Sequence, residues 1–497
     1  NSDNLLIEGD NLEALKALMP FYYNQVKCIY IDPPYNTGYE GWEYNDKVNS
    51  PAIRAWLKKV VGVDDLERHD KWLCMMYPRL KLLKELLADD GLIFISIDDN
   101  ELHNLRTIMN DIFGENNFKN IILIKRGAKS VQAQFEKIDK LGLGAEYILV
   151  YSKTTQFRLD QFYIELDDER QGAWNNHWRG TDRPTMRYEL FGIKPDTGQW
   201  RWSERRSQQA IKNYQKLLKD VGKSKTDVTQ SDIDKWYLEM IEDGDDLDLL
   251  RLSSNNKPEH YIPPSDYKLG NTLWTDLLSS GSGELKKVFG KKVFDNPKPT
   301  ELVKRIIKMT SDDKNAIILD SFAGSGTTGH AVLDLNKEDG GKRKFILVEL
   351  EEKIAKEVII KRLQKVTEGY QGANYPQGTG QGVSYLELNG ELYDSTGFIN
   401  PNASYENLAG YIYFTETKNY LDLNTIKNPY IGSQGSTNYF LFFEGKNNNV
   451  LDNTTLKKTA SYKGSRVIYA DKCLIDEEDL AKQNVVFKQI PYELKKF

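Results

Sequence analysis

Two stretches of the chain, residues 1–118 and 285–370, show apolar runs that alternate with amphipathic segments. Short apolar runs typical of buried parallel strands lie at residues 26–31, 92–97, 317–320 and 345–349. Apolar side chains at helical spacing lie at residues 12–19, 72–87, 101–112 and 301–309. Strands that alternate with helices form a sheet covered by helices, so the pattern predicts an α/β fold with a doubly wound sheet.

The regular pattern breaks between these two stretches and again after them. Residues 119–284 are irregular and predict an insertion. A Gly- and Gln-rich stretch at residues 371–384 is typical of a linker. Residues 385–497 contain further strand-like runs and predict a small C-terminal α/β domain. We therefore expect an α/β core in two halves, one insertion and one C-terminal domain.

The overall charge does not mark the chain as a nucleic-acid binder. Its 497 residues have a net charge of −6, so a contact with DNA would need a local basic surface. Residues 170–206 carry 8 Lys and Arg against 4 Asp and Glu, interleaved with tryptophans. This pattern predicts a duplex-facing surface, although some of the tryptophans are expected to form the insertion's own core. The arginines expected to contact DNA are Arg179, Arg183, Arg187, Arg201, Arg205 and Arg206.

Cysteine usage favours a cytoplasmic protein with reduced thiols. Cys28, Cys74 and Cys473 are far apart, and no C-x-x-C pair suggests a metal site or a redox motif. No apolar run is long enough to span a membrane, so no membrane partner is expected.

The motif Asp32-Pro33-Pro34-Tyr35 follows the first buried apolar run. Two consecutive prolines cannot donate ladder hydrogen bonds, so the strand must stop at Asp32. The result is a stiff turn at the carboxyl end of a strand, where open α/β sheets bind their ligands. The alternative is that the prolines only end the strand and Asp32 only caps the turn.

This turn carries groups that suit methyl transfer to the exocyclic amine of a nucleic-acid base. The amine lone pair is delocalised into the ring, so acceptors must hold its N–H groups before it can react. Asp32 and the Pro33 carbonyl could accept those N–H groups, while Tyr35 stacks on a base swung out of the duplex. Pro34 shapes the turn.

A second motif, the Gly-rich turn at residues 320–329, follows another strand and leads into a helix. Its glycines allow close approach of a ligand to free backbone N–H groups. Gly324, Gly326 and Gly329 fit the dinucleotide fingerprint, and Glu349 lies twenty residues further on, where it could hold a ribose. A dinucleotide-dependent oxidoreductase is therefore one hypothesis. S-adenosylmethionine, which also carries a ribose, is favoured because it supplies the methyl group that the Asp32 turn requires.

The two motifs in this order resemble those of the β-class amino-methyltransferases of DNA. The resemblance rests on residues 32–38 (DPPYNTG) and 322–328 (FAGSGTT), with target recognition between them. Residues 9–12, 72–80, 97–100 and 295–299 further resemble the modification (Mod) subunits of type III restriction systems. The resemblance implies a Rossmann-like, circularly permuted methyltransferase sheet in which the catalytic motif precedes the cofactor motif.

The resemblance also implies roles for individual residues. Phe322, Gly324 and Gly326 would line the methionine side of the cofactor, and Glu349 would bind its ribose. Asp10 would contact the adenine ring, or would simply cap a helix. The full set expected to bind S-adenosylmethionine is Asp10, Asn296, Lys298, Asp320, Phe322, Gly324, Gly326, Thr327 and Glu349.

The implied reaction is transfer of the methyl group to N6 of a flipped adenine in double-stranded DNA, with no metal. N4 of cytosine remains an alternative target, and a solitary adenine methyltransferase is an alternative to a type III subunit. The sequence has no helicase P-loop, so a restriction subunit with helicase and nuclease activity would be a separate partner. Residues after 385 are expected to bind that partner or a second copy of the chain.

Overall fold

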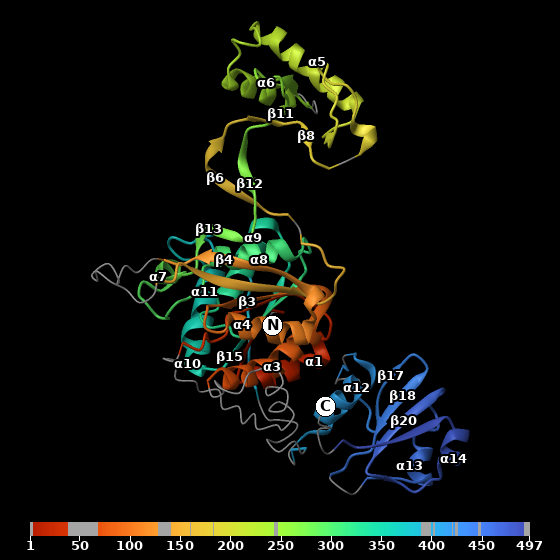
Figure 1. Cartoon of the computed structure of the whole chain (residues 1–497). Helices are drawn as coiled ribbons and strands as arrows, with labels where there is room; N and C mark the ends of the chain where they lie inside the picture. The colour runs from red at the N-terminus through yellow and green to blue at the C-terminus, as the bar shows by residue number, and fades with distance from the viewer. Residues whose placement is uncertain are drawn as a thin grey trace. The chain divides into compact units, whose positions relative to one another are not determined.

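A computed structural model describes residues 3–37, 68–127, 141–159, 161–181, 183–242, 247–388, 399–400, 403–419, 421–422, 426–445 and 449–491 (Figure 1). These residues divide into two compact units. One unit comprises residues 1–160 and 272–497, and the other comprises residues 161–271.

The first unit is built on a nine-stranded sheet with the order β13-β4-β5-β3-β2-β14-β15-β1-β16. Its strands are β1 (Leu5–Glu8), β2 (Val26–Ile31), β3 (Leu87–Ile97), β4 (Phe118–Lys125), β5 (Ala145–Ser152), β13 (Leu273–Leu278), β14 (Ile317–Asp320), β15 (Lys344–Glu349) and β16 (Ser384–Glu387). The pairs that include β5 are antiparallel, and the other pairs of this sheet are parallel.

Successive residues of a strand point to opposite faces of the sheet, and helices cover the apolar side chains on both faces. Ile29 and Ile31 of β2 pack into the core cluster formed with α1 (Asn11–Tyr22), α3 (Arg68–Leu86) and α4 (Leu102–Phe113). Cys28, which precedes Ile29 in the strand, contacts Thr310 at the end of α8 (Thr300–Thr310) on the other face. Two further helices, α9 (Thr327–Asp339) and α11 (Ile360–Glu368), complete this layer, with α9 packed against both α8 and α11. The predicted doubly wound α/β fold is confirmed.

One element boundary differs from the prediction. The sequence pattern predicted a helix over residues 72–87 and a strand over residues 92–97, but α3 ends at Leu86 and β3 already begins at Leu87. Asp89 and Asp90 are exposed, and Val26 of β2 pairs with Leu87. The two acidic residues therefore lie on the solvent-exposed start of the strand rather than in a turn.

The second unit is narrower than the predicted insertion at residues 119–284, so those boundaries need correction. The strands β4, β5 and β13 pair into the central sheet because their apolar side chains complete its core. The unit itself contains β6 (Tyr163–Arg170) paired with β12 (Ser265–Leu269), β8 (Trp178–Arg179) paired with β9 (Gln199–Trp200), and the sheet β10-β11-β7 (Leu250–Leu252, Pro258–Ile262, Ala173–Asn176). Its helices are α5 (Glu204–Val221) and α6 (Gln230–Glu242).

The end of the chain forms a smaller sheet with the order β17-β18-β20-β22. Its elements are α12 (Tyr405–Thr417), β17 (Tyr430–Gln434), β18 (Thr437–Leu441), α13 (Asn453–Lys457), β20 (Ser465–Ala470), α14 (Glu477–Lys482) and β22 (Val485–Gln489). The predicted boundary at residue 385 falls inside β16, which pairs with β1 as the edge of the central sheet. In the described part of the chain, no helix has the length and apolar character needed to cross a membrane.

Candidate active site

The sheet brings the two sequence motifs to the same edge. β2 and β14 are parallel neighbours, with Ile29 opposite Leu319. Asp32 directly follows β2, and Asp320 is the last residue of β14. Two turns that lie almost 300 residues apart in the chain therefore leave adjacent strands at their carboxyl ends, where α/β sheets bind ligands.

The Asp32–Tyr35 turn is held by hydrogen bonds from its own aromatic residue and from α3. The Tyr35 hydroxyl donates to Asp32 Oδ1 at 2.8 Å. The Trp72 indole N–H donates to the Pro34 carbonyl at 2.7 Å. Behind the turn, Asn36 has a φ of 59° and its amide donates to the buried Glu101 carboxylate. The Pro34 carbonyl therefore already accepts a hydrogen bond from the Trp72 side chain. Among the described residues, no donor reaches the Pro33 carbonyl or Asp32 Oδ2.

Lys298, expected beside the cofactor, extends its ammonium group into the catalytic turn. Its Nζ lies 2.6 Å from the Tyr35 hydroxyl, 2.7 Å from Glu146 Oε2 and 3.3 Å from Asp32 Oδ1. Glu146 is the second residue of β5 and is largely buried. The Lys298 backbone carbonyl accepts a hydrogen bond from Thr327 Oγ1 at 3.0 Å. This residue therefore joins the catalytic turn to the Gly-rich turn.

Burial and neighbouring charges shift the pKa values of Asp32 and Lys298 in opposite directions. Burial raises the pKa of Asp32 above its ordinary value, while Lys298 and the Tyr35 hydroxyl partly offset that rise. Burial alone would lower the pKa of Lys298, but Asp32 and Glu146 raise it above its ordinary value. Lys298 is therefore a cation at neutral pH, and its charge stabilises the ionised form of Asp32.

The Gly-rich turn is closed by two carboxylates from adjacent strands. Asp320 Oδ1 accepts the Phe322 N–H at 3.0 Å and its Oδ2 accepts the Thr328 hydroxyl at 2.5 Å. Glu349 Oε2 accepts the Gly324 N–H at 2.9 Å. Burial raises the pKa of each carboxyl group to about 7. Both carboxylate oxygens of Asp320 accept hydrogen bonds within the turn, whereas the Glu349 side chain is partly exposed.

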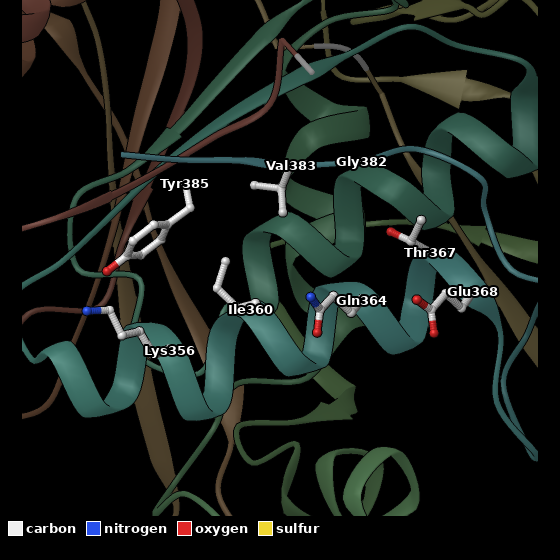
Figure 2. Close-up of a pocket in the computed structure, with 8 residues that line it drawn as sticks. All are labelled: Lys356, Ile360, Gln364, Thr367, Glu368, Gly382, Val383 and Tyr385. Carbon is white, nitrogen blue, oxygen red and sulfur yellow. The ribbon is translucent and has the colours of Figure 1, made fainter. Parts of the chain in front are cut away.

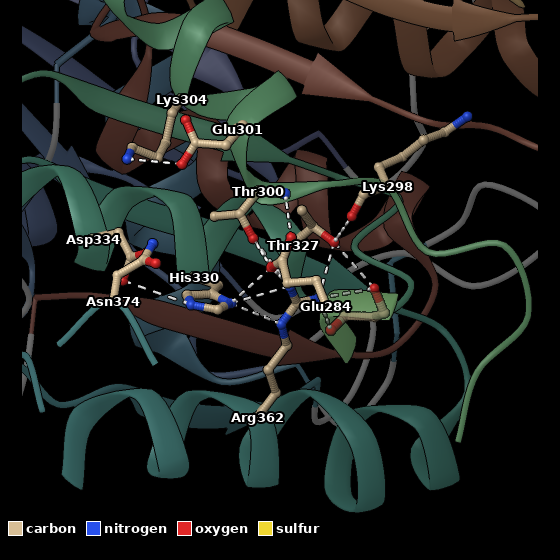
Figure 3. Close-up of polar contacts among 11 residues, drawn as sticks. Glu284, Lys298, Thr300, Glu301, Lys304, Thr327, His330, Asp334, Arg362 and Asn374 are labelled. Carbon is tan, nitrogen blue, oxygen red and sulfur yellow. Dashed lines mark hydrogen bonds and ion pairs between the residues drawn. The ribbon is translucent and has the colours of Figure 1, made fainter. Parts of the chain in front are cut away.

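A buried arginine supports the Gly-rich turn from below (Figure 3). Arg362 of α11 donates to Ser325 Oγ at 3.1 Å, to Thr327 Oγ1 at 2.9 Å and to Glu284 Oε1 at 3.0 Å. Glu284, in α7 (Ser282–Phe289), also accepts the Thr300 N–H at 2.9 Å. His330 lies against Arg362, and burial and the arginine charge lower its pKa well below the ordinary value. The neutral imidazole can accept from Arg362.

The start of α1 is connected to the Gly-rich turn through Arg79. Asp10 caps α1 by accepting the Leu12 N–H at 2.8 Å, and the Arg79 guanidinium lies 3.1 Å from its carboxylate. Arg79 also donates to Asn11, whose amide donates to the Ser321 carbonyl at 3.0 Å. Asp10 therefore caps the helix, as one of the two interpretations expected. Its predicted contact with an adenine ring stays a prediction.

The remaining predicted cofactor residues lie in different settings. Phe322 is buried in the main core cluster, and Gly324 and Gly326 have positive φ values of 51° and 75°. A side chain at Gly326 would meet Ile359 at 2.8 Å, so only glycine fits there. Asn296 is exposed in a left-handed conformation with φ of 51° and points to no other predicted site residue by a hydrogen bond in the described structure.

The arginines of the second unit differ in whether another residue of that unit already binds their side chains. Arg206 pairs with Asp248 at 2.5 Å, and Arg187 and Arg201 donate to backbone carbonyls. The side chains of Arg179, Arg183 and Arg205 are exposed and have no ion-pair partner within residues 161–181, 183–242 and 247–271. Trp200 is buried in the unit's core and Trp174 packs against another core cluster, as expected for some of the tryptophans. These arginines stay predictions for DNA contact.

The described residues also enclose a cavity of about 470 Å³ (Figure 2). It is bounded by one face of the helix from Lys356 to Glu368 and by residues 382–385 leading into β16. None of the predicted site residues lines it, so it adds nothing to the site at the carboxyl ends of β2 and β14.

Sequence reasoning missed Glu146, Trp72 and Arg362 as parts of the site. Trp72 lay in a segment noted only for its helical spacing and its family resemblance, and Glu146 and Arg362 lay in segments that carried no motif. Glu146 is a charged residue at the start of an otherwise apolar strand, which sets it apart in the sequence but does not show that it is buried. Arg362, which is 1% exposed, gives no such signal because its helix carries other basic residues.

The fold and the two turns define an α/β protein with the sheet edge and motif order of the DNA amino-methyltransferases. The DNA methylase family matches residues 26–362. The type III restriction-modification enzyme StyLTI Mod subunit of Salmonella typhimurium is 36% identical over 389 residues, which cover 73% of this chain and 54% of the relative. The type II methyltransferase M.KpnI of Klebsiella pneumoniae is 31% identical over 70% of this chain and 81% of its own length. The chain belongs to the DNA methylase family.

Solved structures of DNA methyltransferases match the chain at low sequence identity. A putative DNA modification methylase from Thermus thermophilus, complexed with S-adenosyl-L-methionine, covers 78% of this chain and all of its own at 14% identity, with a TM-score of 0.37. The PvuII cytosine-N4-specific DNA methyltransferase covers 79% of this chain and 97% of its own at 13% identity, with a TM-score of 0.39. The chain spans about half of the length of the type III Mod subunits that it matches.

Proposed function

We propose that this protein transfers a methyl group from S-adenosylmethionine to N6 of adenine in duplex DNA. The observation that carries the proposal is the Asp32–Tyr35 turn beside the Gly-rich turn on adjacent strands. Asp32 Oδ1 is shared by Tyr35 and Lys298, which leaves Oδ2 and the Pro33 carbonyl for the two N–H groups of an amine. The Mod relatives support a DNA substrate.

The Gly-rich turn fits the proposed cofactor. Gly324 has a positive φ, and the nearest atom that an added Cβ would meet belongs to the Phe294 ring, at 3.3 Å, so the backbone is open to a ligand. Glu349 offers a partly buried carboxylate at the end of β15, suited to a ribose diol. Ser321 Oγ is buried and has no hydrogen-bond partner in the described residues. When bound, S-adenosylmethionine supplies a methyl group activated by its bond to a positively charged sulfur.

The chain's own residues then position and polarise the amine. A flipped adenine stacks on Tyr35, and Asp32 Oδ2 accepts one N6–H while the Pro33 carbonyl accepts the other. These bonds hold the amine at the sheet edge that also carries the Gly-rich turn. Positioning two partners in this way can contribute roughly 7–11 kcal/mol to lowering the barrier. Because N6 must lose a proton as it gains the methyl group, Asp32 is also the nearest carboxylate that can take it.

The test combines wild type with two substitutions. Purified protein is incubated with unmodified DNA and isotope-labelled S-adenosylmethionine, and the labelled nucleoside is identified by mass spectrometry. Label in N6-methyladenine is expected, whereas label in N4-methylcytosine would replace the proposed base and keep the site. Asp32→Asn should abolish transfer while cofactor binding persists, and Glu115→Gln, at an exposed position in the turn before β4, serves as the matched control. Turnover in Asp32→Asn would refute the mechanism.

We further propose that the protein acts as the modification subunit of a type III-like system, paired with a separate restriction subunit, and as a homodimer. The supporting observation is the similarity to Mod subunits from three sources at 30–36% identity. Light scattering of the purified chain tests the dimer. Co-purification with a helicase-nuclease subunit tests the partner, and a monomer that methylates alone would favour a solitary enzyme.

A further inference from the structure

Four ionisable groups from three separate segments meet at the catalytic turn. Asp32 and Tyr35 belong to the turn itself, Glu146 to β5, and Lys298 to the segment before α8. The Lys298 ammonium donates to the Tyr35 hydroxyl and to Glu146, and the Tyr35 hydroxyl donates to Asp32. The result is a continuous chain of hydrogen bonds from the buried carboxylate of β5 to the proposed catalytic carboxylate.

We propose that Lys298 and Glu146 form a positioning pair that sets the charge of Asp32 and the placement of Tyr35 before a base enters. The inference rests on the proposed function for its consequence in turnover, although the arrangement itself does not depend on it. Lys298 holds the Tyr35 hydroxyl and stabilises the Asp32 carboxylate. Glu146 holds Lys298 and competes with Asp32 for the same positive charge.

The geometry explains why two carboxylates are needed for one lysine. Lys298 is 9% exposed and Glu146 is 12% exposed, so neither charge is well solvated. Pairing with Asp32 alone would leave the ammonium 3.3 Å from a single oxygen, a long contact for a buried cation. Glu146 supplies the shorter contact at 2.7 Å and draws the ammonium away from Asp32. Asp32 Oδ2 thereby stays available to an amine N–H.

Other ionisable groups also lie near Asp32 and Glu146. Tyr30 and Asp320 lie near enough for the Asp32 charge to raise the pKa of each. Arg126 lies 3.7 Å from Glu146 on its exposed side. Lys298 lowers the pKa of Asp32 and Glu146 raises it, so removing each partner must shift the titration of Asp32 in opposite directions. Shifts of opposite sign would show that both charges of the pair act on Asp32.

The first experiment measures the titration without turnover. 3-Fluorotyrosine replaces Tyr35 in the full-length protein, and its ¹⁹F resonance is followed against pH, because its hydroxyl bonds directly to Asp32. Lys298→Met should move the midpoint upward, and Glu146→Gln should move it downward. Lys298→Arg should restore a midpoint near that of wild type. Lys304→Met is the control, since Lys304 is also buried but pairs with Glu301 and Glu338.

The second experiment measures kcat/KM for DNA methylation against pH in the same variants. The acidic limb should move in the same directions as the resonance, and Lys298→Met should lose at least about tenfold in kcat/KM at neutral pH. Unmoved midpoints, or shifts of one sign in both variants, would overturn the inference. If wild type methylates no DNA but the resonance midpoints move oppositely, the proposed function fails and the positioning pair stands.

Discussion

Replacing Arg362 should loosen the Gly-rich turn far more than replacing its neighbour on the same helix. Arg362→Met removes a buried guanidinium that donates to Ser325, Thr327 and Glu284. Each hydrogen bond from a charged donor contributes about 1.5 kcal/mol, so three together contribute roughly 4–5 kcal/mol. Glu284 is partly exposed and recovers some hydration, which brings the expected loss to about 3–4 kcal/mol.

Lys361→Met is the matched control because it removes a cation one position away. Lys361 pairs with Glu357 on the exposed side of the helix, with about half of each side chain accessible. Such a surface pair contributes between about 0 and 1 kcal/mol. Hydrogen exchange measured by mass spectrometry reports the local opening of α9, the helix that begins in this turn.

A loss of about 3–4 kcal/mol corresponds to exchange that is faster by about two to three orders of magnitude, since about 1.4 kcal/mol is tenfold. Peptides covering residues 324–335 should show this acceleration in Arg362→Met and almost none in Lys361→Met. Exchange rates within about threefold of each other in the two variants would refute the assigned role of Arg362. Peptides from α6 in the second unit provide the internal reference.

Three further predictions concern the site and the DNA surface. Trp72→Phe should weaken the Pro34 turn by about 1 kcal/mol through loss of one hydrogen bond, and methylation should slow by about fivefold in steady-state assays. Because Trp72 is fully buried, the smaller ring should also lower the melting temperature. Burial raises the pKa of Glu349 to about 7, so its carboxylate forms as pH rises, and calorimetry from about pH 6 to about pH 8 should show cofactor affinity increasing with pH in wild type and flat in Glu349→Gln. Arg179→Ala should reduce the salt dependence of DNA binding by about one unit of slope, measured by fluorescence anisotropy, and Arg206→Ala should reduce it less because its guanidinium is already paired; equal slopes would contradict this ranking.

Sequence reasoning predicted the central strands β2, β3, β14 and β15 because they contain apolar runs bounded by prolines, glycines and acidic residues. The Asp32 turn and the Gly-rich turn were predictable for the same reason, since each consists of residues that dictate backbone conformation. Glu146 and Arg362 were not predictable. Their importance depends on which distant segments pack against them, and single charged residues in a strand or helix carry no local signal of burial.

The boundaries of the insertion were misplaced for a related reason. β4 and β5 lie outside the stretches where strands and helices alternate, and β13 has a register shift where it pairs with β4. The place of these strands in the sheet is set by the strands with which they pair. For β13, that partner is β4, which lies more than 100 residues earlier in the chain. Long-range pairing decides such strands, and a window of local sequence does not contain that information.

The position of β1 has a consequence for how the protein folds during synthesis. This strand begins at Leu5 but pairs with β15 and β16, which end at residues 349 and 387. Ribosomes add about 5–20 residues per second, so the first strand waits on the order of twenty seconds or more for its neighbours. Over that interval β1 has no strand neighbour, and β2, which pairs early with β3, has one unpaired edge until β14 is made. We expect nascent chains arrested before β14 to depend on chaperones, and chains released after β16 to fold without them.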